Sequence, residues 1–367
     1  MNIGFDAKRA FHNYSGLGNY SRLLINSLSN LYENNQHLLY TPNYQPHPLH
    51  DFVNNNCTII TPQGMNSWLP ASFWRTFFMT NHINAQNVDV FHGLSGELPI
   101  SKLKMPKVVT IHDLIFLRYP EYYAVFDRKM YEKKFKHACN IADKIIAISK
   151  QTADDCIQFL GADARKIEIA YQSCDPIFFS SSKNEEVLKK YNLPTRFILC
   201  IGTIEKRKNL LNLVKALQFI DDDFSLVAIG RKTTYTDQVE EYIKSNNLSQ
   251  RVKLMHNVAF HDFPALYSAA SAFVYPSVFE GFGIPILEAL AVGTPVATSN
   301  ISSMPEVGGD AALYFDPHNI EDIAEKTNLL LHDNETVAKL NENRATQLNK
   351  FSIQSIATNV HTIYACL

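Results

Sequence analysis

A strand, a turn, a helix and a second strand follow one another between residues 272 and 298, and this order constrains the fold most strongly. Ala272–Tyr275 is a short apolar run typical of a buried strand. After the turn, Pro285 suits the first helical position, where its missing N–H costs nothing, and Gly293 ends that helix. Pro295–Thr298 is the second strand. Strands joined through a helix pair in parallel, so we expect an α/β sheet covered by helices.

The same alternation runs through the rest of the chain. Leu210–Phe219, Asp237–Ser245 and Phe263–Ala270 are predicted helices of the second half. In the first half, Ser149 is a predicted N-cap for a helix over Lys150–Leu160. The alternation predicts parallel sheets with helices on both faces. The other predicted strands are Ile3–Phe5, Leu38–Tyr40, Cys57–Ile60, Val88–Phe91, Val108–Ile111, Lys144–Ile148, Ile167–Ala170, Phe197–Ile201, Ser225–Ile229 and Val252–Met255.

The chain has 367 residues, which is enough for two α/β domains of ordinary size. The stretch Ser180–Pro194 is irregular and polar, and it separates the two series of strands. We therefore expect a first domain over residues 1–180, a linker over 181–194 and a second domain over 195–352. The predicted fold class is α/β, with two doubly wound, Rossmann-like domains facing each other across a cleft.

Composition excludes several classes of function. A formal net charge of −2 argues against nucleic acid as the main partner, because binding its phosphates needs a basic surplus. The six cysteines are scattered and form no C-x-x-C pair, so we expect reduced thiols rather than zinc ligands or disulfides. The N-terminus lacks the pattern of a signal peptide, and no apolar run is long enough to span a bilayer. The sequence therefore predicts a cytoplasmic protein that is at most peripheral to a membrane.

Two carboxylates, Glu280 and Glu288, flank the turn between the first strand and its helix. Gly281 and Gly283 let a ligand approach the backbone, and the free amides of the helix start form an anion site. We expect Glu280 on the turn and Glu288 in the first helical turn, which suits a sugar nucleotide. The alternative is that a first-turn glutamate only complements the helix dipole. Glycoside hydrolysis by paired carboxylates is rejected because one of them lies in a helix beside a phosphate site.

The string Ser277–Glu288, with Ala289–Val296 and Met304–Val307, resembles the retaining glycosyltransferases of family 4, which have the GT-B fold. The resemblance covers nearly the whole chain, and Gly202–Asn209 is similar to the mannosyltransferase-like branch of that family. It implies that the last helix, over 353–367, returns to the first domain. It also implies that Glu280 binds hydroxyls of the donor sugar and Glu288 those of the ribose. The backbone amides of the turn would hold phosphate or sugar oxygens, and they belong to Gly281, Phe282, Gly283 and Ile284.

A basic run follows the strand that ends at Ile201. Such a run is usually a solvated face, but cations here would stabilise a diphosphate leaving group as its charge grows. Lys208 matches the family's diphosphate lysine. The family often has an arginine where this chain has Thr203, so Arg207 or Arg231 is expected to supply the second positive charge. The residues expected to contact the donor on this side are Gly202, Thr203, Arg207, Lys208 and Arg231.

The first domain contributes a histidine and a glycine loop to the expected site. His112 follows the strand ending at Ile111, and the resemblance implies that it hydrogen-bonds the donor sugar near the reacting carbon. The alternative is a structural histidine with its hydrogen bonds satisfied. Gly16 and Gly18 match a family loop that contacts the donor diphosphate. The side chains expected on the acceptor side are His92 and Asp113.

An aromatic segment over residues 68–78 and a basic segment over residues 128–136 bear on the acceptor. The first contains both tryptophans, and the second contains Arg128, Lys129, Lys133, Lys134 and Lys136. Aromatic side chains near cations suit a membrane interface or a lipid-phosphate acceptor. The equal alternative is that the aromatics are core residues and the lysines form a solvated face.

Taken with the resemblance, these features predict a retaining, metal-independent glycosyltransferase that needs no cofactor. We expect it to move a hexosyl unit, mannosyl from GDP-mannose, onto a glycan or lipid-linked saccharide in surface polysaccharide synthesis. Three alternatives remain: a UDP-sugar-dependent transferase of the same fold, a sugar-nucleotide epimerase, and a non-catalytic subunit that binds sugar nucleotide. The joint presence of His112, Lys208, Glu280 and Glu288 argues against the last. The expected location is the cytoplasm, and peripheral contact with the inner face of the cytoplasmic membrane is an alternative.

Overall fold

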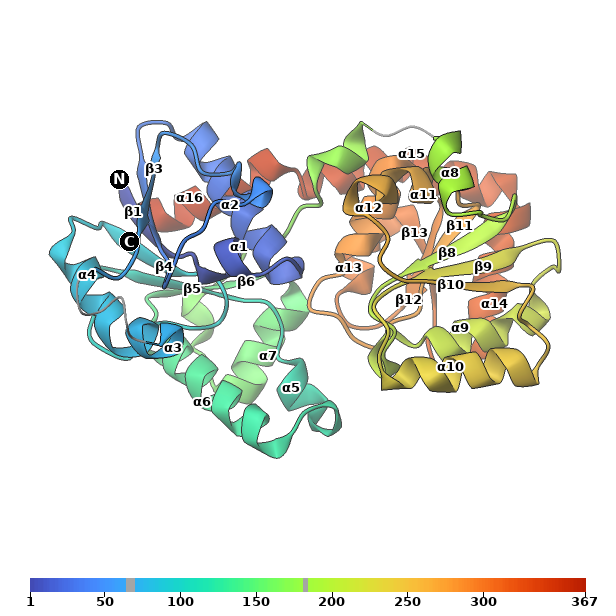
Figure 1. The fold of residues 1–367 in the computed structure, drawn as a ribbon, viewed down its shortest axis with the longest axis horizontal. Helices are drawn as coiled ribbons and strands as arrows, with labels where there is room; N and C mark the ends of the chain where they lie inside the picture. The colour runs from blue at the N-terminus through green and yellow to red at the C-terminus, as the bar shows by residue number, and fades with distance from the viewer. Residues whose placement is uncertain (64–69, 181–183) are drawn as a thin grey trace. The chain divides into compact units, whose positions relative to one another are not determined.

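The chain forms two compact units in the computed structural model, which describes residues 1–63, 70–180 and 184–367. Unit 1 is Met1–Ser173 with Phe351–Leu367, and unit 2 is Cys174–Lys350. Each unit contains one parallel sheet with helices on both faces (Figure 1). Two Rossmann-like domains are therefore present, as the alternation of strands and helices predicts.

The described part of unit 1 holds a seven-stranded sheet in the order β3-β2-β1-β4-β5-β6-β7. All neighbouring strands are parallel. The order reverses between β1 and β4, and ligands of open α/β sheets bind beyond the strand ends at such a point. The strands are β1 (Asn2–Asp6), β2 (Gln36–Tyr40), β3 (Cys57–Ile60), β4 (Val90–Gly93), β5 (Lys107–Ile111), β6 (Lys144–Ala147) and β7 (Ile167–Ile169).

The last helix of the chain, α16 (Ile353–Ala365), packs against α2 (Gly16–Leu31) on one face of the unit 1 sheet (Figure 1). Val360 and Tyr364 of α16 share a buried cluster with Leu24 of α2. The expected return of the C-terminal helix to the first domain is thus confirmed. The other helices of this unit are α1 (Lys8–His12), α3 (Ala71–Phe73), α4 (Met79–Ala85), α5 (Ile115–Arg118), α6 (Val125–Ile141) and α7 (Lys150–Leu160).

The described part of unit 2 holds a six-stranded parallel sheet in the order β10-β9-β8-β11-β12-β13. Its order reverses between β8 and β11, so the loops after these two strands lie beside each other. The last strand of this sheet is absent from the predicted set. The strands are β8 (Phe197–Ile201), β9 (Ser225–Ile229), β10 (Val252–Met255), β11 (Ala272–Tyr275), β12 (Val296–Ser299) and β13 (Ala312–Phe315).

Apolar side chains of both layers form the core of unit 2. Leu213 and Val214 of α9 pack with Val274 of β11 and Ile323 of α14 in one buried cluster. The helices of this unit are α8 (Glu185–Lys190), α9 (Leu210–Ala216), α10 (Thr234–Ser245), α11 (Phe263–Ala269), α12 (Ile284–Val292), α13 (Met304–Gly308), α14 (Ile320–His332) and α15 (Asn334–Lys350).

The predicted linker over 181–194 is in part a helix, so that prediction needs correction. Residues 181–183 lie outside the described residues, whereas α8 occupies 185–190. The Asn184 side chain caps α8 by accepting hydrogen bonds from the first backbone amides. Lys190 and the Tyr191 hydroxyl both bind the Asp262 carboxylate at 2.7 Å, which fastens the helix to unit 2. The chain passes between units at Ser173 and Cys174, before the predicted boundary at 180.

The aromatic segment divides between core and surface. Trp68 and Leu69 lie outside the described residues. The Trp74 side chain is fully buried in the core of unit 1, whereas Phe73 is 44% and Phe77 49% exposed. The core alternative therefore holds for Trp74 and not for the two phenylalanines. Among the described residues, no helix is both long and apolar enough to cross a membrane.

Candidate active site

Lys208 lies on a tight turn that joins β8 to α9. Gly202 directly after the strand has φ +154°, and Asn209 ends the turn with φ +58°. The buried Asn209 amide donates to the carbonyl oxygens of Pro276 at 3.1 Å and Pro317 at 2.7 Å. These bonds fix the turn against the loop that follows β11. The sequence therefore places Lys208 at the carboxyl end of the sheet, where its order reverses.

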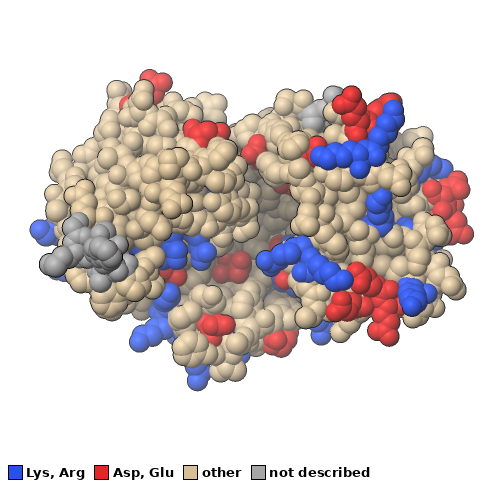
Figure 2. All heavy atoms as spheres, in the orientation of Figure 1, with Lys and Arg blue, Asp and Glu red and all other residues tan. Residues whose placement is uncertain are grey.

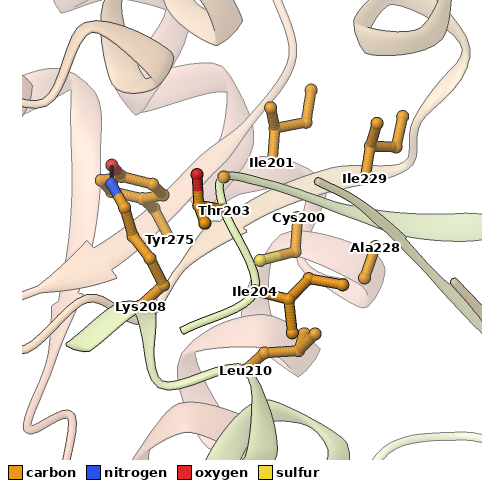
Figure 3. Close-up of a pocket in the computed structure, with 10 residues that line it drawn as sticks. Cys200, Ile201, Thr203, Ile204, Lys208, Leu210, Ala228, Ile229 and Tyr275 are labelled. Carbon is orange, nitrogen blue, oxygen red and sulfur yellow. Dashed lines mark hydrogen bonds between the residues drawn. The ribbon is translucent and has the colours of Figure 1, made fainter. Parts of the chain in front are cut away.

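The Lys208 ammonium has two close partners in this position. Its Nζ donates to the Tyr275 hydroxyl at 2.6 Å and to Glu280 Oε1 at 2.6 Å. Figure 3 shows the ammonium beside the Tyr275 hydroxyl, with Thr203 lining the same pocket. Burial lowers the pKa of Lys208, and the charge of Glu280 offsets part of that effect. Tyr275 and Glu280 therefore hold the ammonium at one point.

Arg207 is the second cation beside Glu280. Its Nη1 lies 2.8 Å from Glu280 Oε2 and donates to the Phe279 carbonyl, also at 2.8 Å. Its Nη2 binds Glu205 Oε1 at 2.6 Å. The Arg231 side chain is exposed and forms no ion pair with any residue that the structure describes. Of the two arginines considered for the second charge, the structure pairs Arg207 with the carboxylate.

Glu280 completes a buried network of one carboxylate and two cations. Burial opposes its charge, but Lys208 and Arg207 outweigh that cost and lower the pKa of Glu280 to about 2. Its carbonyl oxygen accepts hydrogen bonds from Ser302 Oγ at 2.7 Å and Ser303 Oγ at 3.0 Å. The loop after β12 therefore fixes the backbone of Glu280 while the cations fix its side chain. An anionic ligand entering here competes with this carboxylate for both cations.

The helix after the turn begins at Ile284, with Gly283 at φ +113° as its N-cap. Pro285 is consequently the second helical residue rather than the first. The sequence predicts Glu288 in the first helical turn, but four helical residues precede it, so it lies in the second turn of α12. Glu288 Oε2 accepts a hydrogen bond from the Tyr267 hydroxyl at 2.7 Å. Burial raises the pKa of Glu288 to about 7.

In unit 1, His112 has a protein partner on each ring nitrogen. Its Nε2 lies 2.9 Å from the Leu94 carbonyl oxygen, and its Nδ1 lies 3.0 Å from the Gln172 amide nitrogen. Because a carbonyl only accepts and an amide nitrogen only donates, the proton is assigned to Nε2. Burial lowers the pKa of His112 to about 4, so the ring is neutral. A sugar hydroxyl that binds this ring must replace one of these two partners.

The expected contact of His92 with an acceptor conflicts with its burial. His92 is the third residue of β4, not a loop residue, and its side chain is 0% exposed. Its Nδ1 lies 2.6 Å from the Tyr364 hydroxyl, and its Nε2 lies 2.8 Å from Thr110 Oγ1. His92 thus ties the sheet to α16. Asp113 lies on the loop after β5, where its Oδ1 accepts from the Ile115 amide at 3.2 Å.

The two glycines at the start of α2 have different surroundings. A Cβ at Gly18 would lie 1.7 Å from the Asn13 carbonyl oxygen, so packing alone requires glycine there. A Cβ at Gly16 would meet no atom within 4 Å. Gly16 therefore leaves open space for a ligand, whereas Gly18 has a structural reason of its own.

Sequence reasoning did not single out four residues that position the site. Tyr275 holds Lys208, Tyr267 binds Glu288, Gln172 binds His112, and Ser303 holds the Glu280 loop. Tyr275 is the last residue of β11, so its place at the carboxyl end of a strand is a signal that was available. The other three lie on elements whose contacts depend on tertiary packing. In the described ranges, no group of three His, Cys, Asp or Glu side chains is arranged to hold a metal ion.

Two family models match most of the chain. The model "Glycosyltransferase Family 4" matches residues 14–177, and the model "Glycosyl transferases group 1" matches residues 181–347. The chain is 30% identical over 285 residues to O-antigen chain mannosyltransferase B of Escherichia coli. That alignment covers 76% of this chain and 74% of the relative.

Solved structures show the same fold at lower identity. Sucrose-phosphate synthase from Thermosynechococcus elongatus has a TM-score of 0.76 at 20% identity, over 100% of this chain and 98% of that one. Anabaena Alr3699/HepE, solved in complex with UDP and glucose, has a TM-score of 0.75 at 17% identity, over 100% of this chain and 99% of that one. The chain is therefore a glycosyltransferase of family 4 with the GT-B fold, and it belongs among the mannosyltransferase-like members of that family.

Proposed function

We propose that the protein is a retaining transferase that moves a mannosyl unit from GDP-mannose onto a glycan or lipid-linked saccharide. The observation that carries this proposal is the buried network of Lys208, Arg207 and Glu280 at the carboxyl edge of the unit 2 sheet. It brings two cations for a diphosphate together with one carboxylate for sugar hydroxyls. The mannosyl choice rests on the relative from Escherichia coli, which is named as a mannosyltransferase.

In the proposed reaction, the bond between the sugar C1 and the phosphate oxygen breaks as the acceptor oxygen bonds to C1 from the same face. Lys208 and Arg207 stabilise the negative charge that grows on the diphosphate. Glu280 accepts hydrogen bonds from the sugar hydroxyls, which fixes C1 for attack. The departing phosphate oxygen takes the proton of the acceptor hydroxyl, so no protein nucleophile is required. Glu288 binds the ribose, remote from the reacting atoms.

We further propose that the reaction needs no metal ion or other cofactor. Two fixed cations, Arg207 and Lys208, would stabilise the charge that grows on the diphosphate, so a divalent ion is not required for that purpose. Both are held by short contacts before the donor arrives, so little reorganisation accompanies bond breaking. This proposal is independent of the choice of sugar and is tested separately with a chelator.

We propose a membrane-bound, lipid-linked acceptor in surface polysaccharide synthesis, with the protein on the cytoplasmic face. Phe126 at the start of α6 is 78% exposed and Val125 is 59% exposed. The same helix has exposed cations at Lys129, Lys133 and Lys136. Figure 2 shows Lys and Arg side chains near the edge of unit 1 where Figure 1 places α6. Exposed apolar side chains next to cations favour an anionic membrane surface. Loss of sedimentation with anionic liposomes in the F126A variant would support this contact, and unchanged sedimentation would refute it.

A thermal-shift series with nucleotide sugars tests the donor. A bound donor raises the apparent melting temperature by mass action. We expect GDP-mannose and GDP to stabilise the protein and UDP-glucose to leave it unchanged, with the Lys208→Ala variant losing most of the GDP effect. Stabilisation by UDP-glucose alone would instead favour a UDP-sugar-dependent transferase of the same fold.

A further inference from the structure

Lys8 and Arg9 are two neighbouring cations that form no ion pair with the residues that the structure describes. They are the first two residues of α1, which begins one residue after β1, at the strand end where the order of the unit 1 sheet reverses. Both residues are partly buried. Among the residues that the structure describes, neither the Lys8 ammonium nor the Arg9 guanidinium has a hydrogen bond or an ion pair. Burial removes part of the hydration of these cations, and a bound anion would compensate for that loss.

The neighbouring carboxylates are already occupied by other cations. Asp6 binds Arg75, whose Nε lies 3.2 Å from Asp6 Oδ2. Glu97 binds Arg75 at 3.3 Å and Lys134 at 3.3 Å. Burial, followed by the positive charges of Arg75 and Arg9, lowers the pKa of Lys8, while Glu97 and Asp6 act in the opposite direction more weakly. The cluster therefore has four cations (Lys8, Arg9, Arg75 and Lys134) for two carboxylates (Asp6 and Glu97). The positive charge that is left without an ion pair is on Lys8 and Arg9.

The cluster belongs to the same edge of the sheet as His112. β1 pairs with β4, β4 pairs with β5, and His112 follows β5. The charge of Arg9 is also close enough to lower the pKa of His112, after the larger effect of burial. An anion bound by Lys8 and Arg9 would thus lie at the functional edge of unit 1 and not on a remote surface.

We propose that Lys8 and Arg9 bind a phosphate group carried by the acceptor. This inference rests on the proposed function and narrows its acceptor to a phosphorylated one, such as a saccharide linked to lipid through a diphosphate. The donor diphosphate already has Arg207 and Lys208 in unit 2, so it does not need this pair. Arginine can bind two phosphate oxygens with its planar fork, and lysine adds a point charge, which suits a phosphate rather than a neutral sugar.

Equilibrium binding of inorganic pyrophosphate tests the site directly. The Lys208→Ala background weakens the donor site, so calorimetry at low salt measures the unit 1 site with a smaller contribution from unit 2. Adding Lys8→Gln and Arg9→Gln should lower the affinity about tenfold or more, because two charge-assisted contacts are lost. The matched control is Lys102→Gln, which removes an exposed cation of the same unit and should change the affinity less than about twofold.

Charge-conserving variants separate a binding role from a structural one. Lys8→Arg with Arg9→Lys keeps both charges, so it should retain most of the pyrophosphate affinity that the glutamine pair loses. Equal affinity for pyrophosphate in the glutamine pair and in its Lys208→Ala parent would overturn the proposal. Loss of affinity in the charge-conserving pair as great as in the glutamine pair would also overturn it, since the charge would then not be the cause.

Binding of GDP to the protein with native Lys208 distinguishes the source of the phosphate. We expect the glutamine pair to bind GDP within about twofold of the wild type, because the donor cations are intact. A tenfold loss of GDP affinity would assign the anion to the donor and overturn the assignment to the acceptor. If pyrophosphate binding behaves as expected but the wild type never releases GDP from GDP-mannose, the anion site stands and the proposed transferase function fails.

Discussion

Replacing Glu280 by glutamine should tighten the binding of pyrophosphate while slowing sugar transfer. The carboxylate lies 2.6 Å from the Lys208 ammonium and 2.8 Å from Arg207 Nη1, so it occupies the two cations that a diphosphate requires. Glutamine keeps the shape of the side chain but removes the charge. The free cations then attract the diphosphate more strongly, whereas the amide is a poorer acceptor for sugar hydroxyls.

The size of the effect follows from the pKa of Glu280. Lys208 and Arg207 lower it from 4.5 to about 2 despite burial. At about 1.4 kcal/mol per unit, the site favours the charged carboxylate by about 3 kcal/mol. A diphosphate that competes for the same cations forfeits part of this energy in the wild type. Removing the competition should therefore raise the affinity for pyrophosphate about tenfold to a hundredfold.

Calorimetry with pyrophosphate measures this change without involving the nucleotide base. Glu205→Gln is the matched control, because Glu205 also binds Arg207, at 2.6 Å, but is more exposed. Its loss should alter the affinity less than about threefold, as expected for a screened surface pair. Circular dichroism and thermal melting establish that both variants are folded. Unchanged or weaker pyrophosphate binding in a folded Glu280→Gln variant would refute the competition between carboxylate and diphosphate.

The remaining predictions concern the leaving group, the ribose carboxylate and metal ions. Lys208→Ala should lower kcat/KM for GDP release by about two decades or more, or about 3 kcal/mol, because the Lys208 ammonium stabilises the charge that grows on the diphosphate. An unchanged kcat/KM in a folded variant would mean that Arg207 is sufficient. Because the pKa of Glu288 is raised to about 7, the donor KM should rise as the pH falls through 7 in the wild type and stay flat in Glu288→Gln. The same raised pKa means that between about pH 4.5 and 7 the folded state keeps a proton on Glu288 that the unfolded state has lost. The free energy of unfolding of the wild type should therefore fall by about 3 kcal/mol, relative to that of Glu288→Gln, as the pH rises from about 4.5 to above 7. Activity should survive excess EDTA, and loss restored by magnesium or manganese would contradict metal independence.

Local patterns predict the strands of both sheets because each is a short apolar run with turn residues on either side. Phe197–Ile201 and Ser225–Ile229 have the predicted bounds. The edge strand Ala312–Phe315 is missing from the predicted set, although it is the same kind of short apolar run between turn residues. The helix Glu185–Lys190 escapes because its polar residues read as a linker, although Asn184 followed by two glutamates is a helix-start signal.

The site shows where reasoning from single segments ends. Glu280 lies on the turn as its glycines predict, but its pairing with Arg207 depends on two strands that are distant in the sequence and adjacent in the sheet. The burial of His92 depends likewise on Tyr364, which only the return of the last helix brings near. Cysteine and charge patterns carry no information on either contact. The structure therefore mainly shows which residues contact the predicted site residues, and it reveals few new motifs.

Release of GDP from GDP-mannose, with and without membranes that carry lipid-linked saccharides, tests the central claim most directly. We predict slow release by the wild type alone, faster release when the membranes are added, and loss of both in Lys208→Ala. Strong binding of GDP-mannose with no GDP release under any condition would contradict the account and indicate a non-catalytic subunit that binds sugar nucleotide.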